Sequence, residues 1–188
     1  MTEDKENKEV SLVGLTKKEI KDLLGKLDIP DQQLNMRVNQ IWSWVYNKGI
    51  NSIDEMTTLS LDLREELKKY HNLERPQISD EQISKDGTKK WLLKFNDGSE
   101  VETVFIPDDE RGTLCVSSQV GCTLNCTFCH TGTQRLVRNL TSQEIVSQII
   151  IAKDSLSEWG QEPRQITNIV MMGMGEPCLL YTSPSPRD

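Results

Sequence analysis

The chain has 188 residues, of which 36% are hydrophobic and 27% are charged, and its formal net charge is −7 at pH 7. This composition is typical of a globular protein with one domain or slightly more, and the acidic balance argues against broad, non-specific binding of nucleic acid. The first ten residues are too polar for a signal peptide, and no apolar run is long enough to cross a bilayer. We therefore expect a cytoplasmic protein with no membrane partner, whose cysteines are reduced and available for metal binding or catalysis.

Helix signals dominate the first part of the chain. We expect residues 1–10 to be disordered and residues 11–74 to form a helical accessory domain. Thr16 and Glu19 form a capping box, and Ser52 and Glu55 form another. Apolar residues then repeat at helical spacing, in three groups: Ile20, Leu23, Leu24 and Leu27; Val38, Ile41, Trp42 and Val45, followed by Gly49; and Leu61, Leu63, Leu67 and Tyr70.

An alternating pattern replaces the helical one after Arg75-Pro76, and it predicts a β-meander over residues 75–108. Turn signals occur at 86–87 and at 96–98, where the sequences are Asp-Gly and Asn-Asp-Gly. In the strand between them, Trp91, Leu93 and Phe95 point to one side. In the strand that follows, the buried set is either Val101, Thr103 and Phe105 or Glu102, Val104 and Ile106.

Residues 109–177 predict one strand, a cysteine-rich loop, a helix and a second strand. A capping box at Thr141 and Glu144 begins the helix, whose expected apolar face contains Ile145, Val146, Ile149 and Ile150. The apolar run at 166–172 predicts a strand buried on both faces. Ligands collect at the carboxyl ends of parallel strands, so we expect the cysteine loop and residues 173–177 to be neighbours.

The cysteine loop reads Cys122-Thr-Leu-Asn-Cys126-Thr-Phe-Cys129. Three thiolates at this spacing can hold three irons of a four-iron cluster and leave the fourth open, whereas structural zinc sites and electron-transfer clusters take four protein ligands. Zinc bound by the three cysteines and His130 is an alternative, although the adjacent Cys129 and His130 would both have to point at one ion. The sequence at 126–130 also fits c-type haem attachment, for which no export signal is present, and the cysteines could simply be buried.

Cys-x3-Cys-x2-Cys with an aromatic residue before the last cysteine resembles the signature of radical S-adenosylmethionine enzymes. The longer match covers about residues 12–177 and resembles the dual-specificity adenine-C2 methyltransferases of 23S rRNA and tRNA. It rests on the segments Val101-Glu-Thr-Val-Phe-Ile-Pro107, Thr113-Leu-Cys-Val-Ser-Ser-Gln-Val-Gly-Cys122, Arg138-Asn-Leu140 and Asn168-Ile-Val-Met-Met-Gly-Met-Gly-Glu-Pro177. The resemblance implies an α/β protein with a small N-terminal helical domain, a β-meander, and the start of a partial (β/α) radical S-adenosylmethionine barrel over residues 109–177, which is truncated.

The resemblance also implies roles for individual residues. Cys122, Cys126 and Cys129 would hold a 4Fe-4S cluster, and S-adenosyl-L-methionine would bind the open iron through its amino and carboxylate groups. Gly175 and Glu176 match the loop that holds that amino group. Glu102 matches a proposed proton acceptor. Cys115 matches a second cysteine that resolves a covalent enzyme–RNA adduct and that can form a transient disulfide with a methyl-carrying cysteine further along the chain.

The implied partners are 23S rRNA, tRNA and a reducing, flavodoxin-like electron donor, and we expect a monomer. Two alternatives remain: methylation at C8 of adenosine in 23S rRNA, and a non-enzymatic zinc-binding RNA module. After Pro177 the sequence departs from the family pattern. We expect residues 178–188 to be a foreign, adapter-derived tail, and we expect the fragment to be inactive in methyl transfer by itself.

Overall fold

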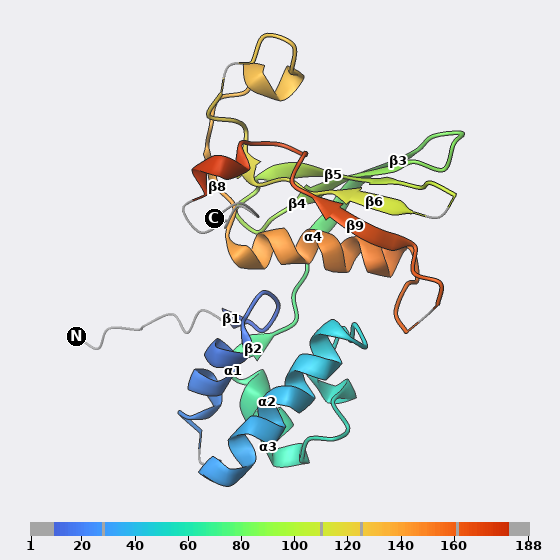
Figure 1. Ribbon diagram of the computed structural model, residues 1–188. Coiled ribbons are helices and arrows are strands. Elements are labelled where there is room, and N and C mark those ends of the chain that lie inside the picture. The colour runs from blue at the N-terminus through green and yellow to red at the C-terminus, as the bar shows by residue number, and fades with distance from the viewer. Residues whose placement is uncertain (1–9, 28, 110, 125, 161, 181–188) are drawn as a thin grey trace, which may run out of the picture. The chain divides into compact units, whose positions relative to one another are not determined.

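The fold is given by a computed structural model in which the chain divides into two compact units, Met1–Arg75 and Pro76–Asp188 (Figure 1). The structure describes residues 10–27, 29–109, 111–124, 126–160 and 162–180. The expected disordered segment lies outside the described residues except for Val10, which begins a strand. The expected foreign tail also lies outside them from residue 181 onward.

The first unit is mainly helical. Its elements are β1 (Val10–Ser11), α1 (Lys17–Leu24), α2 (Asp31–Tyr46), the 3-10 helix η1 (Ile53–Glu55), α3 (Leu61–Lys68) and β2 (His71–Asn72). The capping boxes predicted at Thr16 and Ser52 are both present, but the second one begins a single 3-10 turn and no α-helix. The short strands β1 and β2 pair in parallel and join the two ends of this unit, which the sequence pattern does not indicate.

The second unit contains a five-stranded sheet in the order β3-β4-β5-β6-β9. The strands are β3 (Gln77–Ile83), β4 (Lys89–Lys94), β5 (Glu100–Ile106), β6 (Gly112–Cys115) and β9 (Ile166–Val170). The predicted meander is present as three antiparallel strands, and β6 continues the antiparallel pattern. The predicted β-loop-α-β unit follows, because β6 and β9 are parallel and are connected through α4 (Ser142–Ser155).

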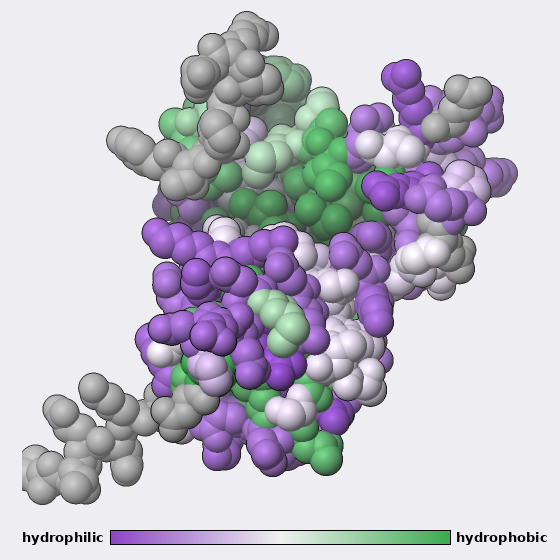
Figure 2. All heavy atoms as spheres, turned by 60° about the horizontal axis from the view of Figure 1, so that its bottom comes forward, coloured by the Kyte–Doolittle hydropathy of each residue, from purple (hydrophilic) through white to green (hydrophobic). Residues whose placement is uncertain are grey.

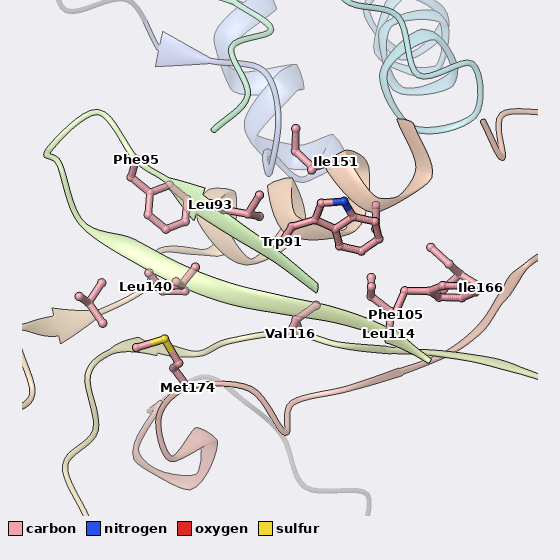
Figure 3. Close-up of a cluster of buried hydrophobic side chains, with 13 residues drawn as sticks. Trp91, Leu93, Phe95, Phe105, Leu114, Val116, Leu140, Ile151, Ile166 and Met174 are labelled. Carbon is pink, nitrogen blue, oxygen red and sulfur yellow. The ribbon is translucent and has the colours of Figure 1, made fainter. Parts of the chain in front are cut away.

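Helix α4 lies along one face of this sheet (Figure 1), and its N-terminus has the predicted capping box of Thr141 and Glu144. Figure 3 shows the hydrophobic core of this unit, which includes Trp91, Leu93, Phe95, Val101, Phe105, Leu114, Ile151 and Ile166. In β5 the buried set is therefore Val101, Thr103 and Phe105. The opposite face of the sheet is left to Glu102 and Val104.

The prediction that β9 is buried on both faces is wrong. Ile166 is buried at its start, but Thr167, Asn168 and Ile169 are exposed, and Ile169 has 50% of its surface accessible. The reason is topological: β9 is the edge of the sheet that the described residues form, with β6 on one side only. An apolar run cannot by itself distinguish a central strand from an edge strand.

The surface differs between the two units. In Figure 2 the visible face of the helical unit is mainly hydrophilic, whereas a hydrophobic area is visible on the unit that contains the sheet. Among the described helices, none has both the length and the apolar character required to cross a membrane.

Candidate functional site

The three-cysteine loop leaves and re-enters the fold at a small two-stranded ribbon. Strand β7 (Gln119–Val120) precedes the loop and β8 (Arg138–Asn139) follows it, and the two strands are antiparallel. The amide of Val137 donates to the carbonyl of Val120 at 2.9 Å, and the amide of Cys122 donates to the carbonyl of Gln134 at 3.4 Å. The loop is therefore fixed at its base.

Cys122, Cys126 and Cys129 are free thiols of intermediate exposure. The amide of Cys129 donates to the carbonyl of Cys126 at 3.2 Å, so these two cysteines belong to one turn. Hydrogen bonds from the backbone of Gly132, and then from Thr131, lower the pKa of the Cys129 thiol. The amide of Leu124 points at the sulfur of Cys122 at 3.4 Å. Amide donors of this kind stabilise thiolates, which are the form that binds metals.

Within the residues that the structure describes, no three His, Cys, Asp or Glu side chains are grouped so that they could hold a metal ion. The sulfurs are therefore not drawn together in this conformation, either as a set of three or with His130. The donor set nevertheless fits an iron–sulfur cluster in its chemistry, since it offers three free thiols on one loop and amide donors at two of them. Binding a cluster would require the loop to close around it.

Residues 173–176 dock on the segment that leads into the cysteine loop, as the sequence predicted. The amide of Gly173 donates to the carbonyl of Val116 at 3.0 Å, and the amide of Ser118 donates to the carbonyl of Met174 at 2.8 Å. The hydroxyl of Ser117 accepts from the amide of Met174 at 2.9 Å. The two segments therefore run side by side immediately before the cysteines.

Glu176 lies at the end of this docked segment. Its side chain caps the short 3-10 helix η3 (Pro177–Leu179) by accepting from the amide of Cys178 at 3.0 Å. This hydrogen bond lowers the pKa of Glu176 and so further favours the ionised carboxylate. A helix-capping role thus accounts for one oxygen of Glu176, and it leaves the carboxylate charge available for a cationic ligand.

Glu102 and Cys115 lie on the same face of the sheet, opposite the hydrophobic core. Cys115 pairs with Val104, and Glu102 precedes Val104 by two residues, so their side chains point to the same side. Glu102 forms an ion pair with Lys90 at 3.1 Å, in which both side chains are partly exposed. Partial burial raises the pKa of the Cys115 thiol, which is therefore protonated at neutral pH.

The sequence reasoning missed the polar residues that connect these parts. Ser117 is fully buried, and its hydroxyl donates to the carbonyl of Glu102 at 2.6 Å. Gln148, fully buried on α4, accepts from the hydroxyl of Thr103 at 2.8 Å and from the amide of Ser117 at 2.7 Å. Gln119 connects the cysteine loop to residue 176. The available signal was a polar Ser-Ser-Gln run between a buried strand and the cysteines.

Known proteins resemble the chain at the level of sequence. Residues 10–73 match the family profile described as "Ribosomal RNA large subunit methyltransferase N-terminal domain". The chain is 53% identical over 187 residues to the "Dual-specificity RNA methyltransferase RlmN" of Bradyrhizobium diazoefficiens, with 95% of this chain and 46% of that protein covered. It is 54% identical to the protein of the same name from Nitrobacter winogradskyi, over 95% of this chain and 47% of that protein.

A solved structure is similar as well. It is the crystal structure of a radical SAM methyltransferase from Sphaerobacter thermophilus, which matches with a TM-score of 0.79 and 39% sequence identity. The match covers 92% of this chain and 49% of that one. Over nearly its whole length the chain is therefore similar to proteins named RlmN and to a radical SAM methyltransferase of known structure, and it spans about half of the length of those proteins.

Proposed function

We propose that this chain forms the part of a radical S-adenosylmethionine RNA methyltransferase that holds the cluster and its cofactor. The whole protein would act in the cytoplasm as a monomer and would methylate C2 of adenosine in 23S rRNA and in tRNA, with a flavodoxin-like protein as the electron donor. The observation that carries the proposal is the docking of residues 173–176 on the segment that enters the three-cysteine loop. The sequence similarity to proteins named RlmN supports the choice of substrate.

The cysteine loop and residues 175–176 would bind different parts of the cluster and its cofactor. Cys122, Cys126 and Cys129 would each bind one iron of a 4Fe-4S cluster and leave the fourth iron to S-adenosyl-L-methionine. When bound, the cluster and S-adenosyl-L-methionine together supply one-electron chemistry that amino-acid side chains lack. The ionised carboxylate of Glu176 would accept a charge-assisted hydrogen bond from the amino group of the cofactor. Gly175 has φ +98° and packs against Gln119, where a side chain would not fit.

The face of the sheet that carries Glu102 and Cys115 would meet the RNA base. Lys90 holds the carboxylate of Glu102 in place by their ion pair, and Glu102 would accept a proton from the adduct. Cys115 would act as a thiol in resolving the covalent enzyme–RNA intermediate, and burial raises its pKa, which favours the protonated form.

Anaerobic reconstitution tests the cluster. The 188-residue chain is incubated with ferrous iron and sulfide or, in a parallel sample, with zinc. About four irons and four sulfides per chain, with a broad charge-transfer absorption, are expected. Stoichiometric zinc with no capacity for iron would contradict the proposal and would support the zinc-binding module.

A chimera tests the reaction. Residues 10–177 replace the matching segment of the Bradyrhizobium diazoefficiens relative, and the chimera is produced in a bacterial host that lacks its own adenosine-C2 methylation. Mass spectrometry of rRNA and tRNA nucleosides is expected to show 2-methyladenosine, and the same chimera with Cys126→Ala is expected to show none. Formation of 8-methyladenosine would instead support the alternative regiochemistry, and neither product from a soluble chimera would contradict both.

A further inference from the structure

We propose that Gln119 is a positioning residue that fixes residues 173–176, the cofactor segment, to the cysteine loop. This inference rests on the proposed function. The side chain of Gln119 would set the distance between Glu176 and the cluster. S-adenosyl-L-methionine has to reach the open iron and the carboxylate at once, so this distance decides the affinity for the cofactor.

The side-chain amide of Gln119 lies where three segments of the chain meet. Only 1% of the residue is accessible to solvent. Its oxygen Oε1 accepts from the amide of Glu176 at 3.0 Å and from the amide of Thr123 at 3.4 Å. Its nitrogen Nε2 donates to the Oδ1 of Asn139 at 2.8 Å. One side chain therefore binds the cofactor segment, the residue after the first cysteine, and the strand that ends the cysteine loop.

The bonding pattern requires a side chain that both donates and accepts. The backbone amides of Glu176 and Thr123 need an acceptor, while Asn139 offers its carbonyl oxygen and needs a donor. A carboxylate in place of Gln119 would serve the first two, and an aliphatic side chain would serve none. Gln119 itself is buried and its hydrogen bonds to Glu176 and Asn139 are partly buried, so water replaces a lost partner only in part.

Packing adds to the hydrogen bonds. A Cβ on Gly175 would lie 2.5 Å from the Cβ of Gln119 and 2.8 Å from its backbone nitrogen. The cofactor segment therefore forms a backbone hydrogen bond to Gln119 at Glu176, and it packs closely against Gln119 at Gly175, where there is no side chain. When residues that orient the groups bound directly to a metal are replaced, metal affinity or activity typically changes by about 10- to 100-fold.

The test uses the 188-residue chain with a reconstituted cluster. Gln119→Leu removes both functions of the amide, and Gln119→Glu keeps the acceptor. Gln165→Leu is the matched control, since the exposed Gln165 lies in the same unit and donates only to the carbonyl of Leu156 among the bonds that the structure describes. Iron and sulfide are counted, and S-adenosyl-L-methionine is titrated by the change in the electron paramagnetic resonance spectrum of the reduced cluster.

Gln119→Leu is expected to keep about four irons and to weaken cofactor binding by about 10- to 100-fold. Gln119→Glu is expected to weaken it less, and Gln165→Leu to leave it unchanged. In a Glu176→Gln background, Gln119→Leu is expected to have less than about twofold further effect. The reason is that both changes act on the same contact, between the carboxylate of Glu176 and the amino group of the cofactor.

Three outcomes would overturn the inference. Unchanged cofactor affinity in Gln119→Leu would do so, as would effects of Gln119→Leu and Glu176→Gln that multiply independently. Loss of iron in both Gln119 variants, in parallel with a lowered melting temperature, would show that the residue only maintains the fold. If the unaltered chain binds no iron, the proposed function fails first, and that result is distinguishable because it precedes any comparison of variants.

Discussion

Replacing Gly175 by alanine is expected to destabilise the second unit in two ways, through an unfavourable backbone conformation and through a steric overlap. Gly175 has φ +98°, a conformation that L-residues adopt at a cost of about 1–2 kcal/mol. The added Cβ would also lie 2.5 Å from the Cβ of Gln119, where ordinary carbon contacts are about 3.5–4.0 Å. Relieving this overlap requires a backbone shift of about 1 Å, and overpacking of this kind costs about 1–3 kcal/mol.

Gly98 provides the matched control. It has φ +82° in the turn between β4 and β5, and a Cβ there would have no heavy atom within 4 Å. Gly98→Ala therefore carries the conformational cost alone, reduced by about 0.4–1 kcal/mol because alanine also restricts the unfolded chain. We expect a loss of about 0.5–1.5 kcal/mol for Gly98→Ala and about 2–4 kcal/mol for Gly175→Ala.

The assay is urea unfolding of the chain, followed by tryptophan fluorescence, to which the buried Trp91 contributes, beside a far-ultraviolet circular dichroism signal. Both variants lie in the same unit, so their midpoints are compared within one transition. Equal losses in the two variants would refute the close packing of residue 175 on Gln119. A Gly175→Ala loss with an altered m-value would indicate a changed unfolded or native state, and it would also count against the steric explanation.

Further predictions concern the N-terminal end of α4 and the thiols. Arg138→Met removes the paired bonds to the partly buried Glu144 and is expected to cost about 1–3 kcal/mol at pH 7. Burial raises the pKa of Glu144, but the guanidinium of Arg138 and the hydrogen bonds from Thr141 together offset this, and the net pKa is lowered. The difference in stability between the unaltered chain and the variant should therefore shrink as the pH falls below about 4.3, and a pH-independent difference would contradict this. Thr141→Ala removes the N-cap and should cost about 1 kcal/mol by urea unfolding, with no change expected if the capping box is unimportant. Cys126→Ala should abolish reconstitution of the full cluster by iron analysis, whereas Cys178→Ala should not; equal iron in both would contradict the ligand assignment.

The parts of the fold that depend on neighbours in sequence could be predicted. The capping boxes at Thr16, Ser52 and Thr141 each need only four consecutive residues, and all three are present. The meander was also predicted, because its turns contain glycine in the left-handed region, as at Gly87 and Gly98. These signals are local, so the rest of the chain does not alter them.

The parts that depend on distant residues could not be predicted. Strand β5 has two alternating faces, and only the position of α4 decides that Val101 is buried and Glu102 is not. The exposure of β9 follows from its place at the sheet edge. In the candidate site, the cysteine spacing is a local pattern, whereas the contacts of Gln119 with Glu176 join residues far apart in the chain. The local Ser-Ser-Gln run indicates buried polar residues but does not identify their partners.

That separation also sets an order of assembly during synthesis. Gln119 and Glu176 are 57 residues apart, and a ribosome that adds about 5–20 residues per second takes roughly 3–11 s to make this stretch. For most of that time the three cysteines already exist, because Cys129 is only ten residues after Gln119, while residues 173–176 have not been made. The thiol loop is therefore complete before the segment that docks on residues 116–119, so the site is assembled from its cysteine side first.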